Sequence, residues 1–313
     1  MDLYYAAGGG LGHITRADRV LRTLGIDATI VTTSPYADRC LGVKSPMLRI
    51  PGFISSDRGE RAPSPALTDT RVDRAELIKW LDELIEKIRP SRIFIDTFPA
   101  GLFGELPDVA TVRESELHYV GRLLRWDSYS PLIGATPLCF ESALLLELLT
   151  PEHDLFIRRT SVVVENLSIE DDEEGDADPE AKAIWVVSHS GPADEVRTLV
   201  HYAMEMRQIE QSEAPIVLTT MDPPPDLPPD ISIVSRYPAR SLFASATRII
   251  TGAGFNSMWE LRKHRHKHRF IAFPRRFDDQ FLRARRARND TAHEYQPNGP
   301  EAEKEKVVFV DHE

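Results

Sequence analysis

Cysteine is scarce in this chain. Only Cys40 and Cys139 occur among the 313 residues, and they are too far apart for metal-type spacing. We therefore expect reduced thiols, a cytoplasmic protein and no bound metal. The sequence also lacks a signal-peptide pattern, because its first residues lead directly into an apolar strand. No apolar run approaches the roughly 18 residues of a membrane span, which leaves only peripheral membrane contact open.

Positive charge is in deficit as well. The chain carries 38 Lys and Arg against 49 Asp and Glu, which gives a net charge of −11. This balance argues against a nucleic-acid partner bound through a positive field over the whole surface. It does not exclude a local phosphate site. The 42% hydrophobic content and the length favour two globular domains of about 150 residues each.

Strand-like and helix-like segments alternate, which is typical of α/β proteins with parallel sheets. Apolar periodicity indicates helices at 14–24, 73–88, 113–129 and 193–211. Apolar runs predict strands at 3–7, 28–33, 92–98, 109–115, 184–191, 215–220, 231–237, 247–252 and 269–274. We predict two Rossmann-like domains, 1–165 and 166–313, with segment 161–167 open to either sheet. The polar stretches 53–70 and 170–180 are predicted loops.

Two glycine-centred turns stand about 240 residues apart in the sequence. GGGLGH at 8–13 follows the first strand, and TGAGFNSMWE at 251–260 follows the strand TRII. Each turn leads from a strand into a helix, so each offers backbone N–H groups and the positive end of a helix dipole to an anion. One such turn in each half predicts two domains that face each other across a cleft, with a sugar nucleotide between them.

The first turn differs from the dinucleotide-binding fingerprint. The third glycine of that fingerprint is replaced by His13, and Thr32 and Thr33 occupy the place of the acidic residue that binds a ribose. NAD is therefore disfavoured as a ligand, and no other cofactor is predicted. Histidine titrates near neutral pH, which would suit His13 to general-base work on a sugar hydroxyl. The alternative is a structural turn with a partly exposed histidine.

The second turn has the composition of a ligand-binding helix start. Gly252 and Gly254 permit close backbone approach, and Asn256 and Ser257 are residue types that cap helices. Glu260 falls one turn into the helix, where a carboxylate could hold a ribose diol or simply complement the helix dipole. Downstream, FDDQFLRARR opens another helix, and its Asp278 and Asp279 are either capping residues or ligand contacts.

These motifs resemble those of the GT-B glycosyltransferases. TGAGFNSMWEL is similar to the donor-binding signature of plant-type UDP-glycosyltransferases, T-H-G-G-W-N-S-x-x-E, and FDDQFLRAR resembles its end. GGGLGHITRADRVL resembles the glycine-rich turn of the peptidoglycan-precursor N-acetylglucosaminyltransferase, and VVSHSGPADE at 186–195 lies where that enzyme has a phosphate turn. The chain departs from the signature at Gly252, where the family has a phosphate-contacting histidine. It departs again at 262–269, where the sequence RKHRHKHR is either a basic lip for an anionic acceptor or a solvated turn.

The resemblance implies a GT-B fold and an inverting, metal-independent transfer of a sugar from a UDP- or NDP-sugar to a hydroxyl acceptor. His13 would be the catalytic base. Donor contacts would come from the following residues: Gly12, Ser188, Ser190, Gly191, Gly254, Asn256, Ser257, Glu260, Asp279 and Gln280. Asp96 and Glu114 are weaker candidates for acceptor contacts. Two alternatives remain open: a sugar-nucleotide hydrolase, since GLGHITR also resembles a UDP-sugar hydrolase turn, and a non-catalytic nucleotide-sugar binder.

Overall fold

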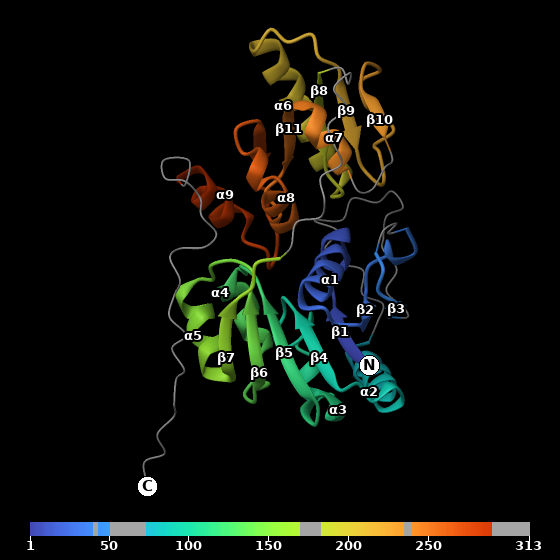
Figure 1. Ribbon diagram of the computed structural model, residues 1–313, viewed down its shortest axis with the longest axis vertical. Helices are drawn as coiled ribbons and strands as arrows, with labels where there is room; N and C mark the ends of the chain where they lie inside the picture. Colours follow the sequence, from blue (N-terminus) through green and yellow to red (C-terminus); the bar gives the residue numbers. More distant parts are fainter. Residues whose placement is uncertain (40–42, 51–72, 170–182, 235–238, 290–313) are drawn as a thin grey trace.

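The computed structural model describes residues 1–39, 43–50, 73–169, 183–234 and 239–289. The predicted loops at 53–70 and 170–180 lie outside these ranges, as does the C-terminal tail. The described residues form two lobes, each built on a parallel sheet flanked by helices (Figure 1). The predicted α/β class is confirmed. None of the helices in the described ranges combines the length and apolar character that crossing a membrane requires.

The first lobe contains a seven-stranded sheet in the order β3-β2-β1-β4-β5-β6-β7, with every pair parallel. Its strands are β1 (Asp2–Ala6), β2 (Ala28–Thr32), β3 (Met47–Arg49), β4 (Arg92–Asp96), β5 (Glu116–Gly121), β6 (Phe140–Leu145) and β7 (Ser161–Asn166). Its helices are α1 (Leu11–Leu24), α2 (Arg74–Ile88), α3 (Ala110–Arg113), α4 (Trp126–Tyr129) and α5 (Pro151–Thr160). Segment 161–167, which the sequence left open, therefore contributes the edge strand β7 to this sheet.

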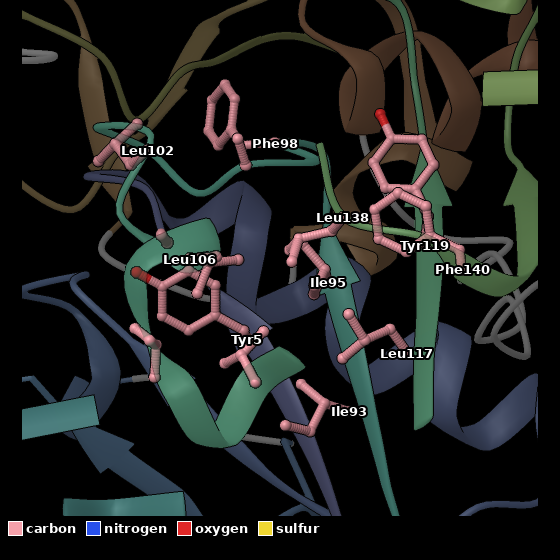
Figure 2. Close-up of a cluster of buried hydrophobic side chains, with 14 of the residues drawn as sticks. Tyr5, Ile93, Ile95, Phe98, Leu102, Leu106, Leu117, Tyr119, Leu138 and Phe140 are labelled. Carbon is pink, nitrogen blue, oxygen red and sulfur yellow. The ribbon is translucent and has the colours of Figure 1, made fainter. Parts of the chain in front are cut away.

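Strand β1 shows why both faces of this sheet are covered. Leu3 and Tyr5 point into the core beneath α2 and α3, whereas Tyr4 and Ala6 point into the core beneath α1. Figure 2 shows part of the first core, with Tyr5 beside residues of β4 and the segment that follows it. A strand that is buried on both faces reads as a continuous apolar run, as LYYAA does.

The second lobe contains a five-stranded parallel sheet in the order β10-β9-β8-β11-β12. Its strands are β8 (Ile184–Ser188), β9 (Ile216–Thr219), β10 (Ser232–Val234), β11 (Ala246–Gly252) and β12 (His268–Ile271). Its helices are α6 (Ala193–Ile209), α7 (Arg240–Ser245), α8 (Phe255–Glu260) and α9 (Gln280–Asn289). Within segment 262–269, a short 3₁₀ helix at Arg262–His264 precedes β12.

Two sequence-based assignments in the first half are wrong. Segment 109–115 was predicted as a strand but forms helix α3, and segment 113–129 was predicted as a helix but contains strand β5. Val109 and Val112 are three residues apart and both are fully buried, so helical packing overrides the strand preference of β-branched residues here. The run after Ser115 has apolar residues that fit a strand as well as a helix, and pairing with β4 and β6 decides for the strand.

Helices α1 and α8 join the two lobes. Phe255 of α8 belongs to the same apolar cluster as Ala17 and Val20 of α1. Asn256 donates hydrogen bonds from Nδ2 to the Gly12 carbonyl, at 2.9 Å, and to Thr15 Oγ1, at 2.7 Å. The N-terminal turns of both motifs therefore lie against each other, although they are about 240 residues apart in the sequence.

Helix α9 forms a second joint between the lobes. Arg283 is only 6% exposed and binds the Glu147 carboxylate of the first lobe at 2.6 and 2.9 Å. Its other contacts are the Asp278 carboxylate, at 2.9 Å, and the Ala253 carbonyl, at 3.1 Å. One guanidinium thus compensates two carboxylates and a carbonyl at the junction of the lobes.

Removal of this guanidinium should destabilise the protein strongly. We expect Arg283→Ala to lower the free energy of unfolding by about 3–5 kcal/mol, because it leaves the largely buried Glu147 carboxylate without its charged partner, whereas Asp278 keeps Arg122. Urea unfolding followed by fluorescence measures this change. Arg285→Ala is the matched control, because Arg285 lies on the same helix and is exposed. Equal stability of the two variants would contradict the role given to Arg283.

Candidate functional site

A cavity of about 940 Å³ lies between the two sheets. It is lined by the turns that follow β1, β2, β4 and β5 in the first lobe and β8, β9, β11 and β12 in the second. Every one of these turns stands at the carboxyl end of its strand, which is where open parallel sheets bind ligands. The volume falls in the range of known small-molecule sites.

His13 lies on the first-lobe wall of this cavity, in the first turn of α1. Its Nδ1 is 2.7 Å from Oδ2 of Asp96, the last residue of the neighbouring strand β4. Arg16 Nη2 also lies 3.0 Å from Nδ1, but this group donates to Asp96 as well. The shorter contact, to a carboxylate that can only accept, assigns the proton to Nδ1 and the lone pair to Nε2. Within the described ranges Nε2 has no hydrogen-bond partner, and the ring faces the cavity.

The protonation states follow from burial and from one arginine. Burial would raise the pKa of Asp96, but Arg16 and the hydrogen bond from His13 hold it well below its usual range. Arg16 donates Nε–H to Asp96 Oδ1 at 2.9 Å and forms an ion pair with Oδ2. Burial lowers the pKa of His13 to about 4, with Asp96 opposing this shift and Arg16 adding to it. At pH 7 the site therefore holds a neutral imidazole against an ionised carboxylate.

Gly8 provides the space that the imidazole occupies. A Cβ atom on Gly8 would lie 2.1 Å from Cδ2 and 2.3 Å from Nε2 of His13. No side chain fits at this distance, so the ring can rest on the turn only because residue 8 is a glycine. The other side of the ring stacks on Phe98, with a centroid distance of 5.9 Å. The turn thus fixes the orientation of the histidine that it presents.

Thr97 links Asp96, the carboxylate that binds His13, to residues that reach the second lobe. It is fully buried and has φ of 67°, a left-handed conformation that is unusual for a β-branched residue. Its hydroxyl donates to Asp96 and accepts N–H groups from Arg16, at 2.9 Å, and Arg122, at 3.1 Å. Arg122 in turn forms an ion pair with Asp278. A continuous polar chain therefore runs from the imidazole to the segment after β12.

Most of the predicted donor residues lie on the cavity wall. Those that line it are Gly12, Ser188, Ser190, Gly191, Gly254, Asn256, Ser257, Glu260 and Gln280. The α8 cap differs from the prediction, because Gly254 occupies the N-cap position and no side chain caps the helix. Asn256 instead bonds to α1, and Glu260 forms an ion pair with Arg19 of α1. These two residues therefore join the lobes as well as face the cavity.

Three predicted site residues do not line the cavity. Asp96 is buried behind His13. Asp279 caps α9, since its Oδ1 accepts the Leu282 N–H at 2.9 Å. Glu114 precedes β5 and is exposed at the amino ends of the strands, the opposite edge of the sheet. Gln280 does line the cavity, but it is 4% exposed and its Oε1 accepts the Phe273 N–H at 3.1 Å.

Several cavity residues were missed at the sequence level, and three of them are Arg122, His189 and Tyr36. Arg122 was grouped with the solvated arginines of a predicted helix, although it follows β5 at the carboxyl edge. His189 stands between two predicted donor residues, Ser188 and Ser190, in the turn after β8. Tyr36 follows β2, and its hydroxyl donates to Asp222 of the second lobe at 2.8 Å. The position directly after an apolar strand was the available signal in the first two cases.

Solved structures share this architecture. The spinosyn forosaminyltransferase SpnP has a TM-score of 0.57 and 11% identity, over 92% of this chain and 83% of that one. The glycosyltransferase SsfS6 of Streptomyces sp. SF2575, complexed with thymidine diphosphate, has a TM-score of 0.54 and 12% identity, over 92% and 85%. S. aureus MnaA with UDP has a TM-score of 0.54 and 12% identity, over 93% and 88%.

Sequence comparison gives no such match, either with a protein-family model or with a curated protein. The structural similarities nevertheless confirm the predicted fold. The chain has the GT-B fold, with two Rossmann-like lobes that face each other across a cleft.

The protonation of His13 can be tested directly. We expect its imidazole C–H signals in an NMR titration to have a midpoint near pH 4, well below the value of about 6.5 for a histidine in water. Because the unfolded chain then binds more protons, His13 makes the folded state less stable as the pH falls through this window. A midpoint near 6.5 would contradict the buried, neutral imidazole described above.

Gly8→Ala should expel the imidazole from its place on the turn. We expect the variant to fold, and the pKa of His13 to rise towards its ordinary value because the displaced ring becomes hydrated. The same NMR titration measures this rise. Gly9→Ala is the matched control, because a Cβ atom at Gly9 meets nothing within 4 Å. If Gly8→Ala leaves the titration of His13 unchanged, the contact between ring and turn does not hold the ring.

Proposed function

We propose that this chain is a glycosyltransferase that moves a sugar from a UDP- or other NDP-sugar to a hydroxyl acceptor. Inversion at the anomeric carbon and independence of metal ions are part of the proposal. The observation that carries it is the His13–Asp96 pair: a neutral imidazole lines the cavity between two GT-B lobes, and its Nε2 has no hydrogen-bond partner among the described residues. Structures of the same fold that hold thymidine diphosphate and UDP support a nucleoside diphosphate as the ligand.

His13 would act as the general base. Its Nε2 accepts the proton of the acceptor hydroxyl while the hydroxyl oxygen attacks the anomeric carbon of the donor. Asp96 then stabilises the imidazolium through the hydrogen bond at Nδ1. The bond from the anomeric carbon to the diphosphate breaks, and the electron pair leaves with the diphosphate. A single displacement in which the hydroxyl attacks the face of the anomeric carbon opposite the departing diphosphate gives inversion.

The donor would lie mainly against the second lobe. The turns at 188–191 and 254–257 supply backbone N–H groups and serine hydroxyls on the cavity wall, and these can compensate the charge of a diphosphate without a metal. Glu260 and Gln280 face the same cavity and would contact the ribose and the sugar. Asp279 would reach the sugar only by giving up its bond to the start of α9.

Nucleotide binding is the first test. Thermal unfolding with UDP, TDP and other nucleoside diphosphates and their sugars, without added metal, should show a selective increase in stability. A ligand at a hundredfold excess over Kd adds about 2.7 kcal/mol to the free energy of unfolding. Glu260→Gln should reduce the effect of the nucleotide. Absence of any shift in the wild-type protein would overturn the donor assignment.

Measuring sugar transfer beside nucleotide affinity distinguishes the role of His13 as a base from a role in binding. We expect His13→Asn to reduce sugar transfer by about 10²–10⁴-fold, the usual contribution of a general base, and to leave nucleotide affinity nearly unchanged. His201→Asn, at an exposed position on α6, is the control. Release of free sugar and nucleoside diphosphate from the donor alone, at the rate seen with acceptors present, would identify a hydrolase instead. Binding without turnover across an acceptor panel would identify a nucleotide-sugar binder.

A further inference from the structure

Positive charge is concentrated around helix α9. Between positions 261 and 289 the sequence has eleven Lys and Arg but only two Asp, whereas the whole chain carries a net charge of −11. The two aspartates are engaged within the protein, because Asp278 forms ion pairs with two arginines and Asp279 caps α9. One short part of an otherwise acidic protein is therefore strongly basic.

Helix α9 turns one face outward. Four of its residues are buried: Gln280, Arg283, Ala284 and Ala287. Phe281, Arg285 and Arg288 follow the i, i+4, i+7 spacing of one helix face and are all exposed, Phe281 to 58%. These three residues are called the α9 ridge below. Figure 1 shows α9 at one margin of the described residues, beside the junction of the lobes.

Two further segments lie beside the α9 ridge. Arg286 donates a hydrogen bond to the Leu148 carbonyl of the first lobe, which places Leu148, itself 75% exposed, next to the helix. On another side of α9, the guanidinium carbons of Arg265 and Arg288 both lie 5.4 Å from the centroid of the Phe270 ring. Exposed apolar side chains and arginines are thus combined on one surface that both lobes build.

We propose that this surface docks on an anionic lipid bilayer. The arginines would contact the headgroups, and Phe281 and Leu148 would enter the boundary between headgroups and acyl chains. Interfacial proteins use this combination of basic and apolar side chains. Each cation near an anionic leaflet strengthens binding, and the effect fades within a Debye length, so the acidic remainder of the protein opposes it little. A polyanion in solution would also attract the arginines, but it would leave Leu148 in water.

The surface is separate from the cavity. The residues that line the cavity do not include Phe281, Leu148 or the arginines of α9. The inference therefore goes beyond the proposed function and does not rest on it. Substitutions on the α9 ridge should leave the affinity for nucleotides unchanged.

Vesicle sedimentation tests the docking. Sucrose-loaded vesicles are made of phosphatidylcholine alone, or of equal parts phosphatidylcholine and phosphatidylglycerol. The wild-type protein should sediment with the mixed vesicles at low ionic strength and far less with phosphatidylcholine alone. Binding to the mixed vesicles should weaken as salt is added, because salt screens the attraction between arginines and headgroups.

Arg285→Glu tests the electrostatic part. It removes a cation and adds an anion, and each such charge changes binding to an anionic surface about fivefold, so we expect the partition coefficient to fall about ten- to thirtyfold. Lys87→Glu is the matched control and should bind as the wild type does. It makes the same change of charge at an exposed position of α2, which Figure 1 places on the other side of the molecule.

Phe281→Ala tests the apolar part. We expect binding to the mixed vesicles to fall about five- to tenfold, because an inserted ring is lost. Phe281→Trp keeps a large apolar ring and should retain binding. Ile209→Ala, at a 72% exposed position of α6, is the control for loss of an exposed apolar side chain elsewhere. Thermal unfolding establishes that the variants are folded, as expected for substitutions at exposed positions.

Three outcomes would overturn the proposal. The first is a wild-type protein that does not bind the mixed vesicles at low ionic strength. The second is equal binding by wild type, Phe281→Ala and Arg285→Glu, which would place the contact elsewhere on the protein. The third is binding to duplex DNA or RNA that Arg285→Glu weakens, together with vesicle binding that Phe281→Ala leaves unchanged, which would identify a site for polyanions. The proposed function is tested separately, by nucleotide binding and turnover.

Discussion

The buried carboxylate of Asp96 is the interaction on which the first-lobe wall of the cleft depends. It lies at the carboxyl end of β4 and binds Tyr4, His13, Arg16 and Thr97. A charge without solvent is costly unless it is paired and fully hydrogen-bonded. The carboxylate therefore dictates where the imidazole points, which tautomer it adopts and where the Arg16 guanidinium lies. A neutral residue at 96 would leave that guanidinium as a buried charge whose remaining partners, such as the Thr97 hydroxyl, are uncharged.

Ion pairs between largely buried side chains also join the two lobes. Arg122 and Arg283 share Asp278, and Arg283 also holds Glu147, so cations from both lobes meet carboxylates from both lobes. Asn256 spans the other joint. Residues that face the ligand cavity thus also determine how the lobes are placed. When a substitution at one of these residues weakens ligand binding, loss of a ligand contact therefore has to be distinguished from movement of a lobe.

The sequence predicted which residues lie at the cleft better than it predicted which side chains those residues contact. Apolar strands followed by glycine turns located the cleft, and His13 was identified because it stands at a helix start where the dinucleotide fingerprint has its third glycine. Segment 109–121 was misread because Val, Leu and Tyr fit helix and strand periodicity over so short a stretch, and neighbouring strands decide. The pairs Arg122–Asp278 and Arg283–Glu147 could not be predicted, because spacing along the chain carries no information on contacts more than 130 residues apart. His189 was overlooked between two serines, since its carboxylate partner, Glu195, appears only when α6 is in place.

Helix α9 is the last element of the chain that the structure describes, yet its arginines hold the first lobe through Glu147 and the Leu148 carbonyl. The seven strands of the first sheet are complete at Asn166, and domains of this kind fold as units in the order in which they are synthesised. The first lobe can therefore form early on the ribosome, with Glu147 still in water. The joint at α1 and α8 can form once residues 255 and 256 are available, whereas the joint at Glu147 must wait for residues 280–289. The order of synthesis therefore makes this second joint the last contact between the lobes to be completed.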